Sequence, residues 1–303
     1  MKRIRIGSRG SMLALAQSNW VKGQLEAHYP EAQVELTIIK TSGDQFIDRP
    51  IAAIGGKGVF TKEIEDALLR NDIDIAVHSM KDLPTELPHG LAIVAVPRRE
   101  DARDVVVSRD GRLLKDLPAG ARVATGSLRR SSQLLHHRGD LAVVPIRGNV
   151  DTRLRKLDEG EADGLIMAAA GLIRIGRPER ITEYLNDEVC LSAVAQGALG
   201  IEARDDGAMA ELLVFIHDAK TNAEVRAERM LLARLGGGCH VPIGARARVH
   251  GDGLKMIAIV ADPNGKALCR GEISGKTSDA VELGRHLAEQ LIDAGADKIL
   301  GLT

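Results

Sequence analysis

Short apolar runs alternate with helical patterns along most of this 303-residue chain. Apolar runs of strand length lie at residues 4–6, 34–39, 73–77, 91–96, 104–107, 122–124, 141–144 and 165–168. Between them, apolar residues recur every three or four positions at residues 12–28, 61–70, 128–138, 150–159 and 170–175, which predicts helices. Strands that alternate with helices are typical of α/β proteins, so the pattern predicts mixed, mostly parallel sheets.

The apolar pattern breaks at residues 96–104, where a proline and many charged residues interrupt it. Such a break predicts a boundary between two α/β lobes. After a long helical pattern at residues 221–235, three strands at residues 245–250, 254–261 and 268–274 precede a helix at residues 278–294. These elements predict a small C-terminal α+β domain.

Composition excludes several classes of function. The formal net charge is −1, so no overall field attracts nucleic acid or an anionic membrane. Three Phe, two Tyr and one Trp are too few for the stacking surfaces of single-stranded nucleic-acid binders. The three cysteines form no Cys-x-x-Cys pair, and no metal site is expected. With no signal-peptide pattern and no long apolar run, a cytoplasmic protein that binds neither nucleic acid nor membrane is expected.

Arginine outnumbers lysine 28 to 13, and residues 122–155 contain seven arginines but two acids. Because the planar guanidinium pairs with two oxygens of a carboxylate or phosphate, such a cluster favours a polyanionic ligand. Residues 125–130 and 146–153 each follow a predicted strand and open a predicted helix, where free backbone N–H groups also attract anions. The simpler alternative is a solvated basic surface.

A second polar cluster, Ser79-Met80-Lys81-Asp82, follows the predicted strand at residues 73–77. A carboxylate beside Lys81 stays ionised and can stabilise a developing positive charge or direct a proton. The alternative is that Asp82 only caps the turn before Pro84.

A cysteine lies in the glycine-rich stretch 236–244 after the long helical pattern. Glycines leave the Cys239 thiol accessible, and a thiol is suited to attack a soft carbon electrophile. A buried structural cysteine is the alternative. Residues 41–59 have no clear periodicity and are expected to form a flexible lid with Lys57 near its end. Neither a Walker A motif nor a dinucleotide fingerprint is present.

Taken together, these motifs resemble the porphobilinogen deaminase (hydroxymethylbilane synthase) family of tetrapyrrole biosynthesis. The resemblance covers nearly the whole chain and lies in residues 7–17, 57–65, 78–85, 125–130, 145–155, 195–202 and 237–245. It implies two lobes like those of periplasmic binding proteins and a small C-terminal domain. The implied domains are residues 1–98 with the return segment 197–216, residues 99–196, and residues 217–303.

The resemblance also implies the chemistry. Four porphobilinogen molecules would lose ammonia and join head to tail on a dipyrromethane cofactor held by a thioether to Cys239. The electrophile would be a methylene-pyrrolenine, and the product hydroxymethylbilane. Asp82 would stabilise the positive charge that develops on the pyrrole ring. Every pyrrole carries an acetate and a propionate, so the resemblance implies that the excess of arginines serves to bind these carboxylates.

The remaining roles follow from the same resemblance. The catalytic residues would be Asp82, Arg9, Arg147 and Arg153. The cofactor would be held by Cys239, Ser79, Lys81, Asp82, Thr125, Ser127, Arg129 and Arg130. Porphobilinogen would be bound by Arg9, Ser11, Lys57, Phe60, Arg147, Asn149, Arg153, Arg174 and Gln196. The family suggests a monomer.

Two other classes of function remain open at this point. A non-enzymatic binding protein for a polycarboxylate would also use two α/β lobes rich in arginine, but it has no need of Cys239. A thiol-dependent acyl transferase would need a base directed at Cys239, and the adjacent His240 cannot be assumed to face it.

Overall fold

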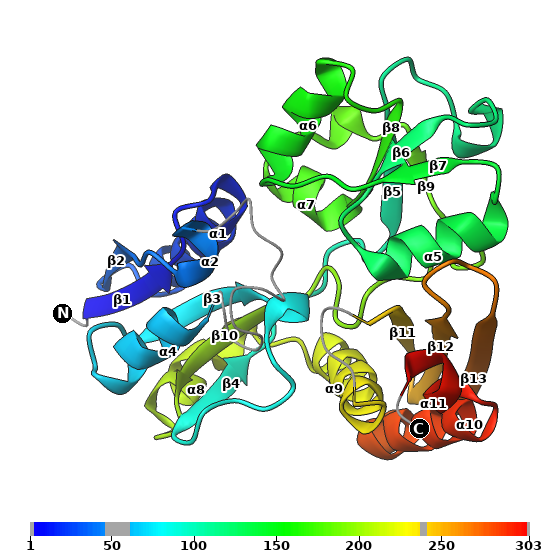
Figure 1. Ribbon diagram of the computed structural model, residues 1–303. Helices are drawn as coiled ribbons and strands as arrows, with labels where there is room; N and C mark the ends of the chain where they lie inside the picture. The colour runs from blue at the N-terminus through cyan, green and yellow to red at the C-terminus, as the bar shows by residue number, and fades with distance from the viewer. Residues whose placement is uncertain (1–2, 46–60, 237–240, 302–303) are drawn as a thin grey trace. The chain divides into compact units, whose positions relative to one another are not determined.

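The computed structural model describes residues 3–45, 61–236 and 241–301 (Figure 1). The chain divides into two compact units, residues 1–99 with 198–219 and residues 100–197 with 220–303. Within the described residues, the first unit contains one five-stranded sheet, and the second contains a five-stranded and a three-stranded sheet.

The sheet of the first unit has the strand order β2-β1-β3-β10-β4. Its strands are β1 (Arg3–Ser8), β2 (Gln33–Ile38), β3 (Ile75–Ser79), β4 (Leu91–Ala95) and β10 (Leu199–Arg204). Strand β1 pairs in parallel with β2 and β3, whereas β10 runs antiparallel to both β3 and β4. The carboxyl ends of β1 and β3 therefore meet at one edge of the sheet.

Helices cover both faces of this sheet. On one face, α1 (Met12–His28) and α8 (Ala208–Leu213) join a core with Val21 and Leu25. On the other face, α4 (Lys62–Leu69) contributes Ile64 and Leu68. The short helix α2 (Ser42–Gln45) lies before residues 46–60, and Ser42 hydrogen-bonds the Glu63 carboxylate.

The five-stranded sheet of the second unit repeats this topology, in the order β7-β6-β8-β5-β9. Its strands are β5 (Asp104–Ser108), β6 (Arg122–Ala124), β7 (Ala142–Val144), β8 (Gly164–Ala168) and β9 (Glu183–Tyr184). Strand β6 is parallel to β7 and β8, and β5 is antiparallel to β8 and β9. Thus β5 occupies the position here that β10 occupies in the first sheet.

The side chains of β5 explain why this sheet needs helices on both faces. Val105 and Val107 point into a core that includes residues of α6 (Val150–Asp158) and α7 (Ala169–Arg174). Val106 points the other way, into a core with Leu134 of α5 (Leu128–His137). Because successive side chains of a strand alternate between faces, a strand covered on both sides has consecutive apolar residues, here the three valines 105–107.

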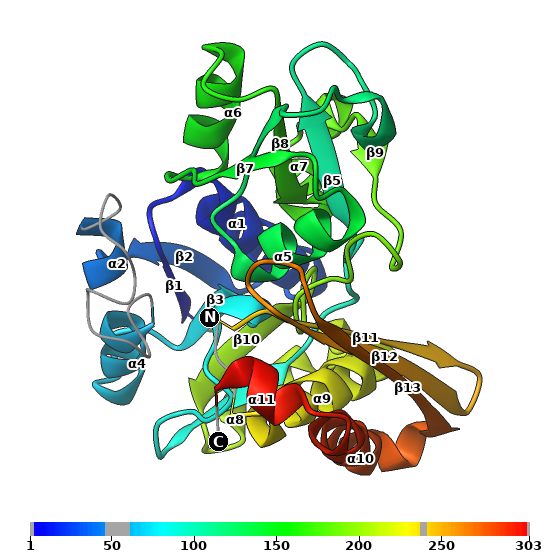
Figure 2. The same cartoon turned by 45° about the vertical axis from the view of Figure 1, so that its right-hand side comes forward.

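The third sheet is an antiparallel meander of β11 (Ile243–His250), β12 (Gly253–Ala261) and β13 (Leu268–Lys276). Helix α10 (Ala280–Asp293) packs on β12 and β13, and α11 (Ala296–Leu300) packs on β12 (Figure 2). Helix α9 (Ala219–Arg234) precedes this sheet in the chain. The short 3-10 helices are η1 (Met80–Asp82), η2 (Leu114–Asp116), η3 (Pro178–Arg180), η4 (Val214–Ile216) and η5 (Thr277–Asp279).

The predicted α/β class and the mixed sheets are confirmed, and helix α1 and strand β6 begin and end where the sequence predicts. The sequence missed α2, which begins inside the predicted lid, and also α8, α11 and the two-residue strand β9. The rest of the lid, residues 46–59, lies outside the described residues. The division into three domains stays a prediction.

Two glycines within helices should respond oppositely to alanine. A Cβ at Gly284 of α10 would overlap the carbonyl oxygen of Ala227 in α9, whereas a Cβ at Gly23 of α1 meets nothing within 4 Å. At an exposed helix position alanine is more favourable than glycine by about 1 kcal/mol, so Gly23→Ala should raise the free energy of unfolding. Gly284→Ala should destabilise it by about 1–3 kcal/mol through overpacking. Urea unfolding of both variants tests this, and stabilisation by Gly284→Ala would contradict the close contact of α9 with α10.

Candidate functional site

In the first unit, predicted site residues follow two neighbouring parallel strands. Arg9 comes directly after β1, and Ser79 ends β3. Ser11 caps helix α1 and accepts a hydrogen bond from the backbone N–H of Ala14 at 3.3 Å. Gln17 of α1 donates to the Ser79 hydroxyl at 2.8 Å, which ties the helix to the end of β3. The structure therefore brings these residues to the same edge of the sheet.

Asp82 lies in the turn η1 that follows β3. A backbone hydrogen bond closes this turn, since the Leu83 N–H donates to the Met80 carbonyl at 3.2 Å. The side chains of Met80 and Leu83 are both buried. The Asp82 side chain is exposed and makes no hydrogen bond or ion pair with any residue that the structure describes. Its carboxylate does not cap the turn, so the purely local role considered from the sequence does not apply.

In the second unit, two polar turns follow the parallel strands β6 and β7. Thr125 follows β6, and its buried hydroxyl accepts a hydrogen bond from the N–H of Ser127 at 3.3 Å. Ser127 and Asn149 are the N-cap residues of α5 and α6, and neither side chain makes a capping hydrogen bond. The first N–H groups of both helices are thus not satisfied by their capping side chains, which suits an anion.

The arginines near these turns differ in their surroundings. Arg147 is exposed after β7. Arg153 of α6 donates from Nε to the Gly148 carbonyl at 2.7 Å. Arg174, at the end of α7, donates to the Gly197 carbonyl at 2.6 Å, and burial lowers its pKa to about 10. At neutral pH this guanidinium is still charged.

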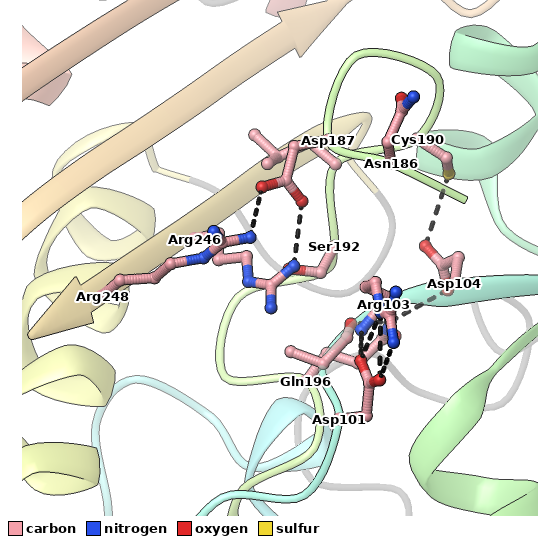
Figure 3. A network of polar contacts seen from close by, with 12 residues as sticks. Asp101, Arg103, Asp104, Asn186, Asp187, Cys190, Ser192, Gln196, Arg246 and Arg248 are labelled. Atoms are coloured by element: carbon pink, nitrogen blue, oxygen red, sulfur yellow. Dashed lines mark hydrogen bonds and ion pairs between the residues drawn. The ribbon is translucent and has the colours of Figure 1, made fainter. Parts of the chain in front are cut away.

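Arg129 and Arg130, in the first turn of α5, surround the carboxylate of Asp104. Arg129 Nη1 lies 2.6 Å from Oδ2, and Arg130 donates to Oδ1 from Nε at 2.9 Å and from Nη2 at 2.7 Å. Gln196 donates to Oδ1 at 2.9 Å, and the Cys190 thiol donates to Oδ2 at 3.4 Å. Figure 3 shows Asp104 beside Cys190 and Gln196. The structure thus brings together three predicted site residues around a carboxylate that the sequence analysis did not single out.

The charges of this cluster are buried together. Asp104 is fully buried, and Arg129 and Arg130 are 4% and 6% exposed. Burial alone would raise the pKa of Asp104, but the two guanidiniums outweigh it and hold that pKa well below its ordinary value. Burial raises the pKa of the Cys190 thiol to about 12, and the nearby Asp104 charge adds to the shift. Two guanidiniums and one carboxylate leave one net positive charge.

A strained turn places Gln196 against Asp104. Ala195 has a φ of 57°, in the left-handed region that side chains other than glycine avoid, and its N–H donates to the buried Glu228 carboxylate at 2.6 Å. The other oxygen of Glu228 accepts from the Ala247 N–H of β11 at 2.8 Å. Helix α9 therefore holds both the turn and the third sheet.

Three predicted site residues, Lys57, Phe60 and Cys239, lie outside the described residues. Asp104 and Glu228 were not predicted from the sequence. A signal for Asp104 exists, because two adjacent arginines in the first turn of a covered helix need a buried counter-charge. Glu228 carries no comparable signal, since an acidic residue in a charged helix is ordinarily solvated.

Two features are absent from the described ranges. None of the helices there has the length and apolar character needed to span a membrane. No group of three or more His, Cys, Asp or Glu side chains among those residues is arranged to hold a metal ion.

Two α/β sheets of corresponding strand order and a buried arginine pair with excess positive charge define an α/β protein with a site suited to anions. Comparison with protein families is more specific. The model "Porphobilinogen deaminase, dipyromethane cofactor binding domain" matches residues 4–211, and "Porphobilinogen deaminase, C-terminal domain" matches residues 222–293. The chain belongs to the porphobilinogen deaminase family.

Curated relatives agree. The porphobilinogen deaminases of Trichlorobacter lovleyi and Pelobacter propionicus are 53% and 52% identical over 300 residues, which cover 99% of this chain and 96% of each relative. That of Geobacter sulfurreducens is 51% identical over 301 residues, covering 99% of this chain and 94% of the relative. The chain is a transferase of this family with dipyrromethane as its cofactor. The alternative of a non-enzymatic binding protein has no support among these relatives.

Similarity to solved structures is weaker. The arginine-specific periplasmic binding protein STM4351 of Salmonella typhimurium is 15% identical with a TM-score of 0.43, covering 73% of this chain and 94% of that chain. The aliphatic sulphonate binding protein SsuA of Escherichia coli is also 15% identical, with a TM-score of 0.40, covering 77% of this chain and 70% of that chain.

The raised pKa of Cys190 predicts a loss of stability at alkaline pH. An unfolded thiol ionises near pH 9, whereas this thiol ionises near pH 12 in the folded chain. As the pH rises above 9, the thiol therefore ionises in the unfolded state first. This lowers the free energy of unfolding by about 1.4 kcal/mol per pH unit until about pH 12. Cys190→Ala should show a smaller loss in urea unfolding between pH 8 and pH 10.5.

Cys269→Ala provides the control, because Cys269 is partly exposed in β13. It should keep the wild-type pH dependence of the unfolding free energy. Equal pH dependence of wild type and Cys190→Ala would show that the Cys190 thiol is not specially protected from ionisation.

Proposed function

We propose that this chain deaminates four porphobilinogen molecules and joins them head to tail on a covalently bound dipyrromethane, releasing hydroxymethylbilane. The observation that carries the proposal is the buried, positively charged arginine pair at the start of α5, in a chain whose overall charge is −1. Each pyrrole ring of such a chain carries two carboxylates, so the growing product gains negative charge at every step. Buried guanidiniums bind such groups with defined geometry.

The residues present fit the cofactor. Arg129 and Arg130 hold one more positive charge than Asp104 neutralises, which suits a ligand that carries carboxylates. We assign Cys239 to the thioether bond and Thr125, Ser127, Ser79, Lys81 and Asp82 to polar contacts with the cofactor. The dipyrromethane, when bound, supplies the free pyrrole α-carbon to which substrate is joined.

A second set of residues binds and orients porphobilinogen. We assign carboxylate binding to Arg9, Arg147, Arg153 and Arg174, which are all permanently charged at neutral pH. Arg9, Arg147 and Arg153 act nearest the reacting atoms. Further contacts with substrate are assigned to Ser11, Asn149, Gln196, Lys57 and Phe60.

Asp82 is the residue that we assign to the chemistry itself. Positive charge develops on the pyrrole ring when ammonia leaves and again when the new carbon–carbon bond forms. A carboxylate that is fixed in a backbone-closed turn and makes no competing ion pair within the described residues can stabilise that charge without reorganising. Asp82 thereby lowers the barrier to both steps.

Several properties of the whole chain complete the proposal. We propose three domains, residues 1–98 with 197–216, residues 99–196 and residues 217–303, of which the third carries Cys239. We also propose a cytoplasmic monomer that binds neither nucleic acid nor membrane. The absence of a Cys-x-x-Cys pair and the near-neutral charge support a reducing compartment and a small-molecule substrate.

Intact-protein mass spectrometry of the purified chain tests the covalent cofactor. Wild type should carry the added mass of two deaminated porphobilinogen units, and Cys239→Ser should carry none, because serine does not provide the thiol nucleophile. Cys269→Ala should be loaded like wild type. A wild-type chain that stays unmodified even after incubation with porphobilinogen or hydroxymethylbilane would refute the proposed function.

Asp82→Asn should lower the turnover rate of cofactor-loaded chains at least about 100-fold, because the amide cannot stabilise a positive charge as a carboxylate does. The chain offers a matched control, since Lys115-Asp116-Leu117-Pro118 repeats Lys81-Asp82-Leu83-Pro84 in a second 3-10 turn. Asp116→Asn should leave turnover unchanged. Product formation per loaded chain is measured in both, and near-wild-type turnover in Asp82→Asn would exclude the assigned role.

A further inference from the structure

We propose that Asp104 is a positioning residue that orients the Arg129 guanidinium toward a carboxylate of the cofactor, an inference that rests on the proposed function. Asp104 is fully buried, and the sequence resemblance assigns it no role.

Both oxygens of Asp104 are committed to holding other side chains. Oδ1 accepts from Arg130 Nε, Arg130 Nη2 and the Gln196 amide, and Oδ2 accepts from Arg129 Nη1 and the Cys190 thiol. One carboxylate thus fixes two guanidiniums from adjacent positions of α5. Any rotation of the Asp104 side chain would disturb all of these contacts together.

The two arginines are left in different states. Arg130 donates from all three of its nitrogens, since Nη1 also bonds the Ile166 carbonyl at 3.3 Å. Arg129 donates only from Nη1, to Asp104, to the Leu191 carbonyl at 2.6 Å and to the Cys190 sulfur at 3.6 Å. Its Nε and Nη2 make no hydrogen bond with any residue in the described ranges. Because the guanidinium is planar, fixing Nη1 also fixes the direction of these two donors.

The remaining donors of Arg129 have the geometry that a carboxylate needs. Nε–H and Nη2–H of one guanidinium point the same way and bind both oxygens of a carboxylate. Such a ligand would also neutralise the excess positive charge of the cluster. An unpaired buried charge is costly, so the site is completed by an anion.

A second carboxylate in the same unit shows that this arrangement is not general. Asp187 accepts from Arg246 at 3.0 Å and from Arg248 at 2.8 Å, and so also lies between two arginines (Figure 3). The Arg248 side chain, however, is 50% exposed, so water solvates its excess charge. Asp187 thus pairs with one partly buried and one half-exposed arginine, whereas both arginines of Asp104 are buried.

The test compares Asp104→Asn with Asp187→Asn, the same change in a carboxylate that is also held by two arginines. Each chain is purified as a folded monodisperse fraction, its thermal unfolding is recorded, and the share of chains that carry the covalent cofactor is measured by intact-protein mass spectrometry. At a temperature where all are folded, Asp104→Asn should carry the cofactor in at least about tenfold fewer chains, because misdirected donors lose the carboxylate. Asp187→Asn should be loaded like wild type.

Asp104→Glu is the second variant, because it keeps the negative charge but moves it by one methylene. If Asp104→Asn fails to fold, Asp104→Glu should still fold. The share of Asp104→Glu chains that carry the cofactor should also fall below that of wild type. Full loading of folded Asp104→Asn or Asp104→Glu would overturn the positioning role, as would failure of both to fold, which would make Asp104 a structural residue. An unloaded wild type would instead refute the proposed function, so the two failures are distinguishable.

Discussion

The second unit depends on one buried carboxylate, that of Asp104. Taking a carboxylate and two guanidiniums out of water costs several kcal/mol for each ion, and this cost is offset only when every charge is well paired. Here each Asp104 oxygen receives at least two donors, which come from α5, from Cys190 and from the turn at Gln196. Removing one partner of such a group typically costs about 3–5 kcal/mol. The cluster therefore constrains how β5, α5 and residues 190–197 pack together.

The same cluster connects stability with binding. A structural ion pair would be complete with equal charges, but this one has an additional guanidinium charge. An anion that pairs with Arg129 would raise the stability of the folded chain, because any ligand that binds only the folded chain shifts the folding equilibrium toward it. Among the residues that the structure describes, Arg174 has no carboxylate partner of this kind. Burial lowers its pKa to about 10, which means that burial destabilises the charged form of its guanidinium. A carboxylate ligand would reverse that shift too.

How far the sequence predicts this structure depends on whether the signal is local. The apolar periodicity of Met12–His28 is local, and α1 has these bounds. Strand β5 is different, because the apolar run that predicts it is the same whichever way the strand runs, so periodicity does not reveal that it is antiparallel to its neighbours. The two-residue β9 is too short to show a period. The arginines at 129 and 130 suggested an anion site, but their buried partner Asp104 lies 25 residues away, where the sequence shows only a charge before three valines.

The turn that carries Asp82 separates what local sequence determines from what topology determines. Both Lys-Asp-Leu-Pro segments form a 3-10 turn with buried leucines, so the same local sequence adopts the same kind of turn in two places. Asp82 follows β3, whose carboxyl end lies beside that of its parallel neighbour β1. Asp116 instead precedes β6, and Arg138 at the end of α5 donates to the carbonyls of Leu114 and Leu117 around it. Since α5 starts after the carboxyl end of β6 and returns along the sheet, Asp116 lies at the amino-terminal edge of these strands. Ligands of α/β sheets bind at the carboxyl edge, so the direction of the neighbouring strands places Asp82, and not Asp116, at the edge where a ligand is expected.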